Sequence, residues 1–152
     1  MINIKEIIGE IPYEVSQEQG GAWVRNPADI HNGVDIVVPK FTPIYLCSDS
    51  IITRASYHFT DPIYSFGNRV SAYCTIEGKK VEVYTCHLDG YAFNISLPRE
   101  DGGFYRGKKG DFIGRVGSSG SCIGRDGGVH LHFGLRDYET GEWLKVRDYF
   151  EI

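Results

Sequence analysis

A histidine and an aspartate stand close together in the segment HNGVD at residues 31–35. His31 and Asp35 are four residues apart, and Gly33 between them lets the backbone bend so that both side chains can reach one point. An imidazole nitrogen and a carboxylate oxygen are both common zinc ligands, at about 2.0–2.2 Å from the ion. The pair therefore indicates a metal site, although a turn histidine beside a capping aspartate has the same pattern.

A second histidine pair lies in the segment HLH. His130 and His132 occupy alternate positions of a predicted strand, so both rings leave the same face about 7 Å apart, while Leu131 and Phe133 point into the core. One histidine of this pair could bind a metal while the other lies beside bound water or substrate. A surface pair that binds metals without specificity is the alternative.

His87 ends the segment KVEVYTCH. Strand alternation places Cys86 on the opposite face, which predicts a packing role for this cysteine and no metal binding. Taken alone, His87 is also typical of a strand-end histidine with ordinary hydrogen bonds. His58 has no partner motif, and we expect it to lie outside the site.

The three segments indicate more in combination than singly. Two ligands from HNGVD and one from HLH would form a three-ligand zinc site with one open position, which is the arrangement of catalytic zinc. The open position holds a water whose pKa the metal lowers toward about 7. The spare histidines nearby would transfer protons at neutral pH.

Short runs rich in β-branched and aromatic residues must position these histidines. Seven runs predict strands at 33–38, 43–47, 50–56, 68–76, 80–87, 111–117 and 129–135. No helical segment separates them, so we expect an all-β domain, with a single antiparallel sheet folded into a flattened, partly open barrel. Long loops at 58–67, 88–110 and 117–128 would wall a zinc-containing groove.

The composition narrows the classes of partner. A formal net charge of −4 provides no global positive field that would attract nucleic acid. The first fifteen residues do not resemble a secretory signal, and no run approaches the roughly 20 apolar residues that span a bilayer. We therefore expect no nucleic-acid or membrane partner, and synthesis in the cytoplasm without a leader.

The four cysteines are Cys47, Cys74, Cys86 and Cys122. A reducing compartment argues against disulfides. A hairpin turning at Gly78 and Lys79 would set Cys74 opposite Val83 and Ser71 opposite Cys86. The sulfurs of Cys74 and Cys86 would then lie roughly 10 Å apart, so we expect free, mostly buried thiols.

The segment HNGVDIVVPKFTPIY resembles a signature of the lysostaphin and LytM-type zinc metalloendopeptidases. SFGNRV, YTCHLDG, GKKGDFIGRVGSSG and GVHLHFGL are similar, in the same order, to later motifs of that family. The similarity begins near residue 21 and continues to the end of the chain. It implies a peptidase domain at 21–152, preceded by an extension at 1–20 that packs on the domain.

The resemblance also implies a role for each site residue. The ligands of one zinc ion would be His31, Asp35 and His132. The catalytic residues would be His87 and His130. The implied substrate is the peptide of bacterial peptidoglycan, cut in the stem peptide or in the cross-bridge. We further expect three residues to line the substrate groove: Arg25, Asn68 and Ser119.

The sequence departs from the family pattern at a few positions. Val129 stands where a proline usually precedes HLH, Phe41 stands where glycine is common, and the loop before HLH is longer than usual. These segments would form the groove walls, so the departures affect which peptide bond is cut. The residues of the metal site match the family pattern.

The biological setting follows from these expectations. A wall hydrolase without a leader acts after lysis or delivery, which favours a phage or prophage lysin that works as a monomer, with a virion or a holin in its context. Two alternatives exist: a non-catalytic module that binds zinc or a peptide, and a carbohydrate-binding or virion structural protein on the same β scaffold.

Overall fold

The computed structural model describes residues 1–20, 31–58, 66–92, 104–120 and 128–152, and only the backbone of 56–58 and 91. One large sheet contains β2 (Glu14–Gln17), β3 (Val34–Val37), β4 (Pro43–Tyr45), β5 (Ser50–His58), β6 (Gly67–Ile76), β7 (Lys79–Tyr91), β8 (Tyr105–Gly107), β9 (Phe112–Val116), β10 (Leu131–Asp137) and β11 (Trp143–Leu144). A small parallel sheet pairs β1 (Ile2–Asn3) with β12 (Phe150–Glu151). The helical elements described are α1 (Lys5–Ile8) and a 3₁₀ turn at Val146–Asp148.

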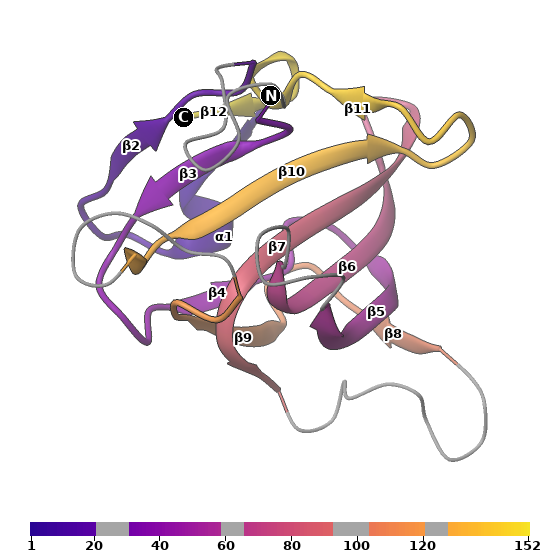
Figure 1. Cartoon of the computed structure of the whole chain (residues 1–152). Helices are drawn as coiled ribbons and strands as arrows, with labels where there is room; N and C mark the ends of the chain where they lie inside the picture. Colours follow the sequence, from indigo (N-terminus) through magenta and orange to yellow (C-terminus); the bar gives the residue numbers. More distant parts are fainter. Residues whose placement is uncertain (21–30, 59–65, 93–103, 121–127) are drawn as a thin grey trace.

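The large sheet is antiparallel, and its main path runs β2-β3-β10-β7-β6-β5-β8 (Figure 1). β11 pairs with β10, and β9 joins the far end of β7 to β4. Within the described residues the sheet does not close on itself, which confirms the predicted all-β fold and partly open barrel. All seven predicted strands are present, and the unpredicted elements are too short to give a periodic signal.

The hydrophobic core lies on one face of this sheet. Leu131, Phe133 and Leu135 alternate along β10 and are fully buried, as the pattern of the HLH segment predicts. Phe150 of β12 packs edge-on against Phe133, with ring centroids 4.9 Å apart. The amino-terminal segment adds three buried side chains to the same core: Ile4, Ile7 and Ile8. The opposite face of β10 is therefore left for polar side chains.

No helix in the described part of the chain has the length and apolar composition needed to cross a lipid bilayer.

The hairpin between β6 and β7 turns at Glu77 and Gly78, one residue earlier than predicted. Both residues have positive φ, 50° and 79°, which is what a two-residue type I′ turn requires, and glycine takes the second position. Cys74 consequently pairs with Val81 and not with Val83. The predicted register was wrong by two residues because the prediction put the glycine in the first turn position.

The observed register also differs from the pairing predicted for Cys86. Ser71 pairs with Tyr84, while Cys86 pairs with His132 of β10. The thiol of Cys74 is hydrogen-bonded to the thiol of Cys47. Cys47, Cys74 and Cys86 are all buried thiols outside any disulfide, as expected, and Cys122 lies outside the described residues.

Phe41 occupies a left-handed backbone conformation in the turn before β4, with φ of 70°. Its N–H donates to the carbonyl of Val116 at 2.8 Å, and its own carbonyl accepts from Arg115 Nη1 at 3.1 Å. Its ring is 51% exposed, so little packing compensates the unfavourable φ. Glycine, which is common at this position in the resembling family, adopts this φ without steric cost.

We predict that Phe41→Gly stabilises the protein by about 0.5–1 kcal/mol, because relief of the left-handed strain exceeds the extra chain entropy of glycine. Urea unfolding of the two proteins measures this difference. Phe41→Ala, which keeps the strain and removes the ring, is the matched control. A lower stability of Phe41→Gly would mean that the aromatic ring contributes more than the backbone costs.

Candidate metal centre

The pairing of β3 with β10 brings the first two candidate ligands together. Asp35 and His132 are direct partners across these strands, so both side chains project from the same face. His132 Nδ1 lies 3.0 Å from Asp35 Oδ1. The neighbouring residues on the other face, Val34 and Phe133, are fully buried in the core. Core packing thus fixes the register that joins two distant parts of the sequence.

Gly33 lets His31 approach the same point. A Cβ atom at Gly33 would lie 2.6 Å from the carbonyl oxygen of Phe133 and 2.7 Å from His132 Nε2, which is too close for any side chain. The chain can therefore turn tightly against β10 only with glycine here. His31 Nε2 reaches a position 3.1 Å from Asp35 Oδ1, so the bend predicted from HNGVD is present.

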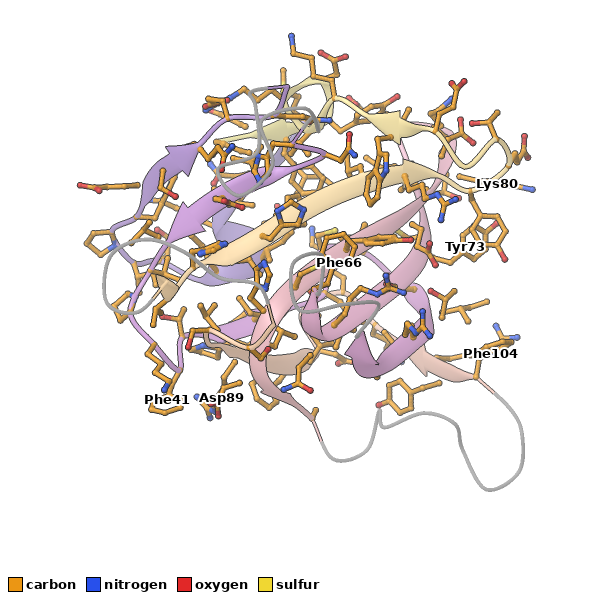
Figure 2. The ribbon with its side chains drawn as sticks, in the orientation of Figure 1. Phe41, Phe66, Tyr73, Lys80, Asp89 and Phe104 are labelled. Atoms are coloured by element: carbon orange, nitrogen blue, oxygen red, sulfur yellow. The ribbon has the colours of Figure 1, made fainter. Side chains whose placement is uncertain are left out.

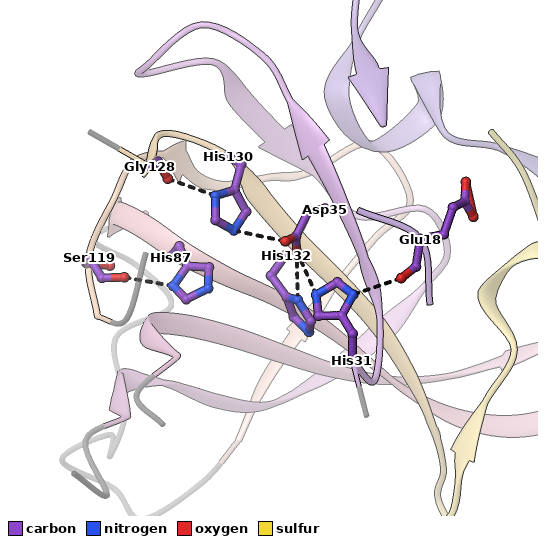
Figure 3. Close-up of polar contacts among 8 residues, drawn as sticks. All are labelled: Glu18, His31, Asp35, His87, Ser119, Gly128, His130 and His132. Atoms are coloured by element: carbon purple, nitrogen blue, oxygen red, sulfur yellow. Dashed lines mark hydrogen bonds and ion pairs between the residues drawn. The ribbon is translucent and has the colours of Figure 1, made fainter. Parts of the chain in front are cut away.

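Figure 3 shows the resulting cluster of two imidazoles around one carboxylate. One possible ligand atom from each of His31, Asp35 and His132 lies within 4.8 Å of the others. All three side chains are buried. These residue types suit zinc, which takes imidazole nitrogen and carboxylate oxygen ligands.

The hydrogen bonds of His31 test whether a cation fits. His31 Nδ1 lies 3.2 Å from the carbonyl oxygen of Glu18. A carbonyl oxygen can only accept, so Nδ1 carries the proton and, in a neutral ring, Nε2 presents a lone pair. That lone pair then faces the anionic Asp35 Oδ1 at 3.1 Å. Two electron-rich atoms at this distance repel unless a proton or a metal ion lies between them, so the site fits a cation.

The pKa values at this cluster indicate the same charge balance. Burial would raise the pKa of Asp35, but hydrogen bonds from His132 and His31, with positive charge on His132 and His130, hold it well below its usual range. Burial would lower the pKa of His31, but the hydrogen bond and charge of Asp35 raise it. Asp35 is therefore anionic at neutral pH, and its surroundings attract a positive charge.

The two predicted catalytic histidines lie at the edge of this cluster (Figure 3). His130 Nδ1 is 2.8 Å from the carbonyl oxygen of Gly128, and His87 Nδ1 is 2.8 Å from that of Ser119. Each carbonyl fixes the proton on Nδ1 and leaves Nε2 free to accept. His130 Nε2 lies 3.6 Å from Asp35 Oδ2. The rings of His87 and His130 are 4.9 Å apart, so all five predicted residues meet.

Both of these histidines are neutral at pH 7. Burial, with smaller contributions from His130 and His132, lowers the pKa of His87 to about 3. Burial also lowers the pKa of His130, although the charge of Asp35 opposes it. Each ring therefore has a lone pair available near the candidate metal position.

The comparisons with known proteins agree with this picture of the fold. No family model matches the chain. No curated protein matches it either. The catalytic domain of the antimicrobial peptidase lysostaphin from Staphylococcus simulans does match in structure, with a TM-score of 0.68 and 22% identity over 90% of this chain and 91% of that one. The chain has the lysostaphin-type peptidase fold.

Two further solved structures share the lysostaphin-type fold. A variant of the catalytic domain of the prophage-encoded protein EnpA from Enterococcus faecalis has a TM-score of 0.62 and 20% identity over 91% of this chain and 92% of that one. A zinc-containing peptidase from Vibrio cholerae has a TM-score of 0.61 and 21% identity over 88% of this chain but 36% of its own. At these identities the likeness establishes the fold, and the site rests on its own geometry.

His87 is held in place by a strained backbone within this fold. Its φ is 63°, its N–H donates to the carbonyl of Phe66 at 2.8 Å, and its carbonyl accepts from Gly117 at 3.1 Å. Such a conformation costs on the order of 1–3 kcal/mol in a residue other than glycine. The predicted strand alternation of Cys86 and His87 does not hold, because the left-handed φ of His87 interrupts the regular strand. Cys86 is instead the cross-strand partner of His132, and it lies outside the candidate ligand group.

Two of the predicted groove residues support His87. Asn68 donates through its side chain to the carbonyls of Leu88 at 3.1 Å and Asp89 at 3.3 Å, and its N–H donates to Ser119 Oγ at 2.9 Å. Ser119 in turn supplies the carbonyl that receives His87 Nδ1–H. These contacts give Asn68 and Ser119 a positioning role, and their contact with substrate stays a prediction. Arg25 lies outside the described residues, as does the side chain of His58.

No feature of the sequence indicated the carbonyls that orient the rings. Glu18 and Gly128 contribute only backbone oxygens, and any residue type supplies those. Phe66 stacks on the ring of His132, with centroids 5.5 Å apart and planes at 23°, and its carbonyl holds His87. Its place in the motif SFGNRV was the one available indication.

We predict that zinc at one hundred times its dissociation constant stabilises the wild-type protein by about 2.7 kcal/mol, because the ion binds the folded cluster and not the unfolded chain. In Asp35→Ala this stabilisation should disappear, since the charged ligand is lost. Thermal unfolding with and without zinc measures the effect. Asp89→Ala, which removes an exposed aspartate, is the control, and equal zinc stabilisation of Asp35→Ala would contradict the ligand assignment.

A second prediction concerns pH. The pKa of His87 falls from about 6.5 in the unfolded chain to about 3 in the folded one, so its contribution is fully present above pH 6.5 and is lost as the pH falls toward 3. From pH 7 to 5, the metal-free wild type should lose about 1–2 kcal/mol more stability than His87→Gln. Urea unfolding at both pH values tests this. Equal losses in the two proteins would show that His87 is not buried as a neutral ring.

Proposed function

We propose that this chain is a zinc-dependent endopeptidase that hydrolyses peptide bonds in bacterial peptidoglycan, in the stem peptide or the cross-bridge. The observation that carries this proposal is the meeting of a three-residue ligand group with two further histidines, each of which presents a free ring nitrogen. The lysostaphin-type fold supports it, because proteins of this fold include peptidases. The ordered motifs that resemble the peptidoglycan-cutting family support the substrate class.

In this proposal His31, Asp35 and His132 hold the ion. When bound there, zinc supplies Lewis acidity that polarises a peptide carbonyl and activates water. Glu18 orients the ring of His31 through its carbonyl and makes its Nε2 the ligand atom. The remaining chemistry is proton transfer by the two other histidines.

We infer that His130 is the group that takes a proton from water. Its Nε2 is an acceptor, and Asp35 Oδ2 at 3.6 Å stabilises the ring once it becomes positive. His87 lies deeper and faces two other imidazoles, so the same charge is less favourable there. Its contribution in this proposal is to orient the reacting groups and to return a proton to the leaving amine.

The setting that we infer is a phage or prophage lysin that meets the wall after release or delivery. EnpA, which shares the fold, is prophage-encoded. A wall peptide is the partner in this setting, and we expect the chain to act as a monomer.

We predict that His130→Ala keeps its zinc and loses about 10²-fold or more in turnover, because a positioned general base contributes about 10²–10⁴-fold. Metal analysis and a wall-digestion assay measure the two properties in the same preparation. Loss of zinc in this variant would make His130 a ligand. Full hydrolysis of purified walls by His130→Ala would contradict its catalytic role.

The decisive experiment for the proposed function is digestion of purified cell walls of known chemistry, followed by mass spectrometry of the newly freed termini. New amino and carboxyl termini that appear with zinc and vanish with a chelator are the expected result. Zinc-loaded protein that frees no termini from any wall would favour a non-catalytic binding module.

A further inference from the structure

Three buried side-chain atoms have no hydrogen-bond partner among the described residues: Arg69 Nε, Ser71 Oγ and His132 Nε2. The last belongs to the candidate metal ligand. The other two are alternate residues of β6, so they project from the same face of the sheet. Ser71 pairs with Tyr84, and the guanidinium carbon of Arg69 lies 4.6 Å from the centre of the Tyr84 ring. Arg69, Ser71 and Tyr84 therefore form one cluster on the face opposite the core.

Arg69 is unusual because it is a buried charge whose Nε has no hydrogen-bond partner and which forms no ion pair among the described residues. The residue is only 7% exposed, and its guanidinium lies over the rings of Tyr84 and Phe66, with the carboxylate of Glu82 acting on its charge from outside ion-pair distance. Glu82 on the same face accepts a hydrogen bond from Thr53 at 2.6 Å. An arginine cannot lose its proton, and a charge held away from water is costly unless an anion pairs with it. A ligand that brings a carboxylate would remove that cost.

The cluster lies next to the candidate metal centre. The ring of Phe66 stacks on His132, with centroids 5.5 Å apart, and its centroid lies 5.8 Å from the Arg69 guanidinium carbon. Figure 2 shows Phe66 over the middle of the sheet. β7 separates β6 from β10, so Arg69 and His132 are two strand spacings, roughly 10 Å, apart. An extended peptide covers that distance with about three residues.

A second arginine on this face, Arg136, is engaged in hydrogen bonds, whereas Arg69 Nε has no partner among the described residues. Arg136 donates through Nε to the carbonyl of Gly141 at 2.8 Å and through Nη1 to the hydroxyl of Tyr84 at 3.3 Å. Arg136 thereby holds Tyr84 in place, and the Tyr84 ring in turn supports the plane of the Arg69 guanidinium.

We propose that Arg69 and Ser71 form a subsite for a free carboxylate of the substrate peptide, about three residues from the bond that is cut. This subsite rests on the proposed function. With it, the enzyme would prefer wall peptides that carry a free carboxylate at this distance to wall peptides that carry a carboxamide there. The guanidinium donates to the carboxylate in the geometry that arginine provides, and the Ser71 hydroxyl donates beside it. Phe66 separates the subsite from the metal ligand.

Nuclear magnetic resonance of the arginine side chains in the zinc-loaded protein tests the subsite without relying on catalysis. The probes are an acetyl-blocked tripeptide that ends in D-alanine with a free carboxylate, and the same tripeptide as its carboxamide. We expect the carboxylate to shift the Arg69 Nε–H resonance and the carboxamide to leave it in place. No shift with the carboxylate, or equal shifts with both peptides, would overturn the proposal.

Kinetics with the full chain provide the second test. Arg69→Gln should lower kcat/KM for wall fragments with a free carboxylate by about 10- to 100-fold, mostly through KM, and leave fragments with a carboxamide nearly unchanged. On fragments with a free carboxylate, kcat/KM of Arg69→Lys should fall between the values of the wild type and Arg69→Gln. Arg106→Gln removes an exposed charge from β8 and should leave kcat/KM unchanged for both kinds of fragment. A loss in Arg69→Gln that is equal for both kinds of fragment would make Arg69 a structural residue.

The two tests separate the subsite from the function it rests on. If wild-type protein cuts no wall fragment while the carboxylate peptide still shifts Arg69 Nε–H, the peptidase proposal fails and the subsite stands. If wild-type protein cuts both kinds of fragment equally and the resonance does not move, the subsite fails and the peptidase stands.

Discussion

A backbone carbonyl oxygen accepts hydrogen bonds and cannot donate them, and this constraint determines the chemistry of the candidate site. Three such oxygens, from Glu18, Ser119 and Gly128, each face the Nδ1 atom of one histidine. Each ring must place its proton there, so its other nitrogen carries a lone pair. The lone pairs and the carboxylate of Asp35 together form an electron-rich cluster in a buried place, and a cation is what makes that cluster stable.

The carbonyls are held by contacts far from the site. The segment around Glu18 is fixed to the end of the chain: Gln19 bonds Leu144 O and Val146 N at 2.9 Å each, and Arg147 pairs with the Glu18 side chain. Ser119 is held through Asn68 at the start of β6. The first twenty residues are thus part of the support for the candidate metal ligand His31, in addition to their packing in the core.

The fold also leaves a polar face beside the candidate metal centre. Packing of alternate residues of β6, β7 and β10 into the core leaves the other alternate set on the opposite face. The rings of Phe66 and Tyr84 lie on this face, and the Arg69 guanidinium packs against both of them. One strand register therefore places the candidate metal centre and the proposed carboxylate subsite on the same face of the sheet.

Much of the fold and site could be predicted from the sequence, because the signals were local. Strand alternation placed Leu131 and Phe133 in the core, and the spacing in HNGVD with Gly33 predicted a tight approach of His31 to Asp35. The pairing of Asp35 with His132 is a long-range contact, and only the family resemblance indicated it. The hairpin register was wrong because a one-residue shift in the turn moves every cross-strand partner by two.

The positive φ at His87 and the proton-fixing carbonyls were beyond prediction for a different reason. Both depend on backbone positions that tertiary contacts determine, and neither requires a particular residue type. The left-handed φ at Phe41 belongs to the same class, although the glycine common in the resembling family gave a hint of it.

In the proposed centre His31, Asp35 and His132 bind one metal ion, while backbone carbonyls hold the ring protons of His31, His87 and His130 on Nδ1. Long-range ¹H–¹⁵N spectra of the imidazole rings, recorded before and after one equivalent of zinc, test it most directly. We expect Nδ1-protonated rings for His31, His87 and His130 in the zinc-loaded protein, with the zinc-induced nitrogen shifts concentrated on His31 and His132. A proton on Nε2 of His31 in that state, or zinc shifts confined to His87 and His130, would contradict it.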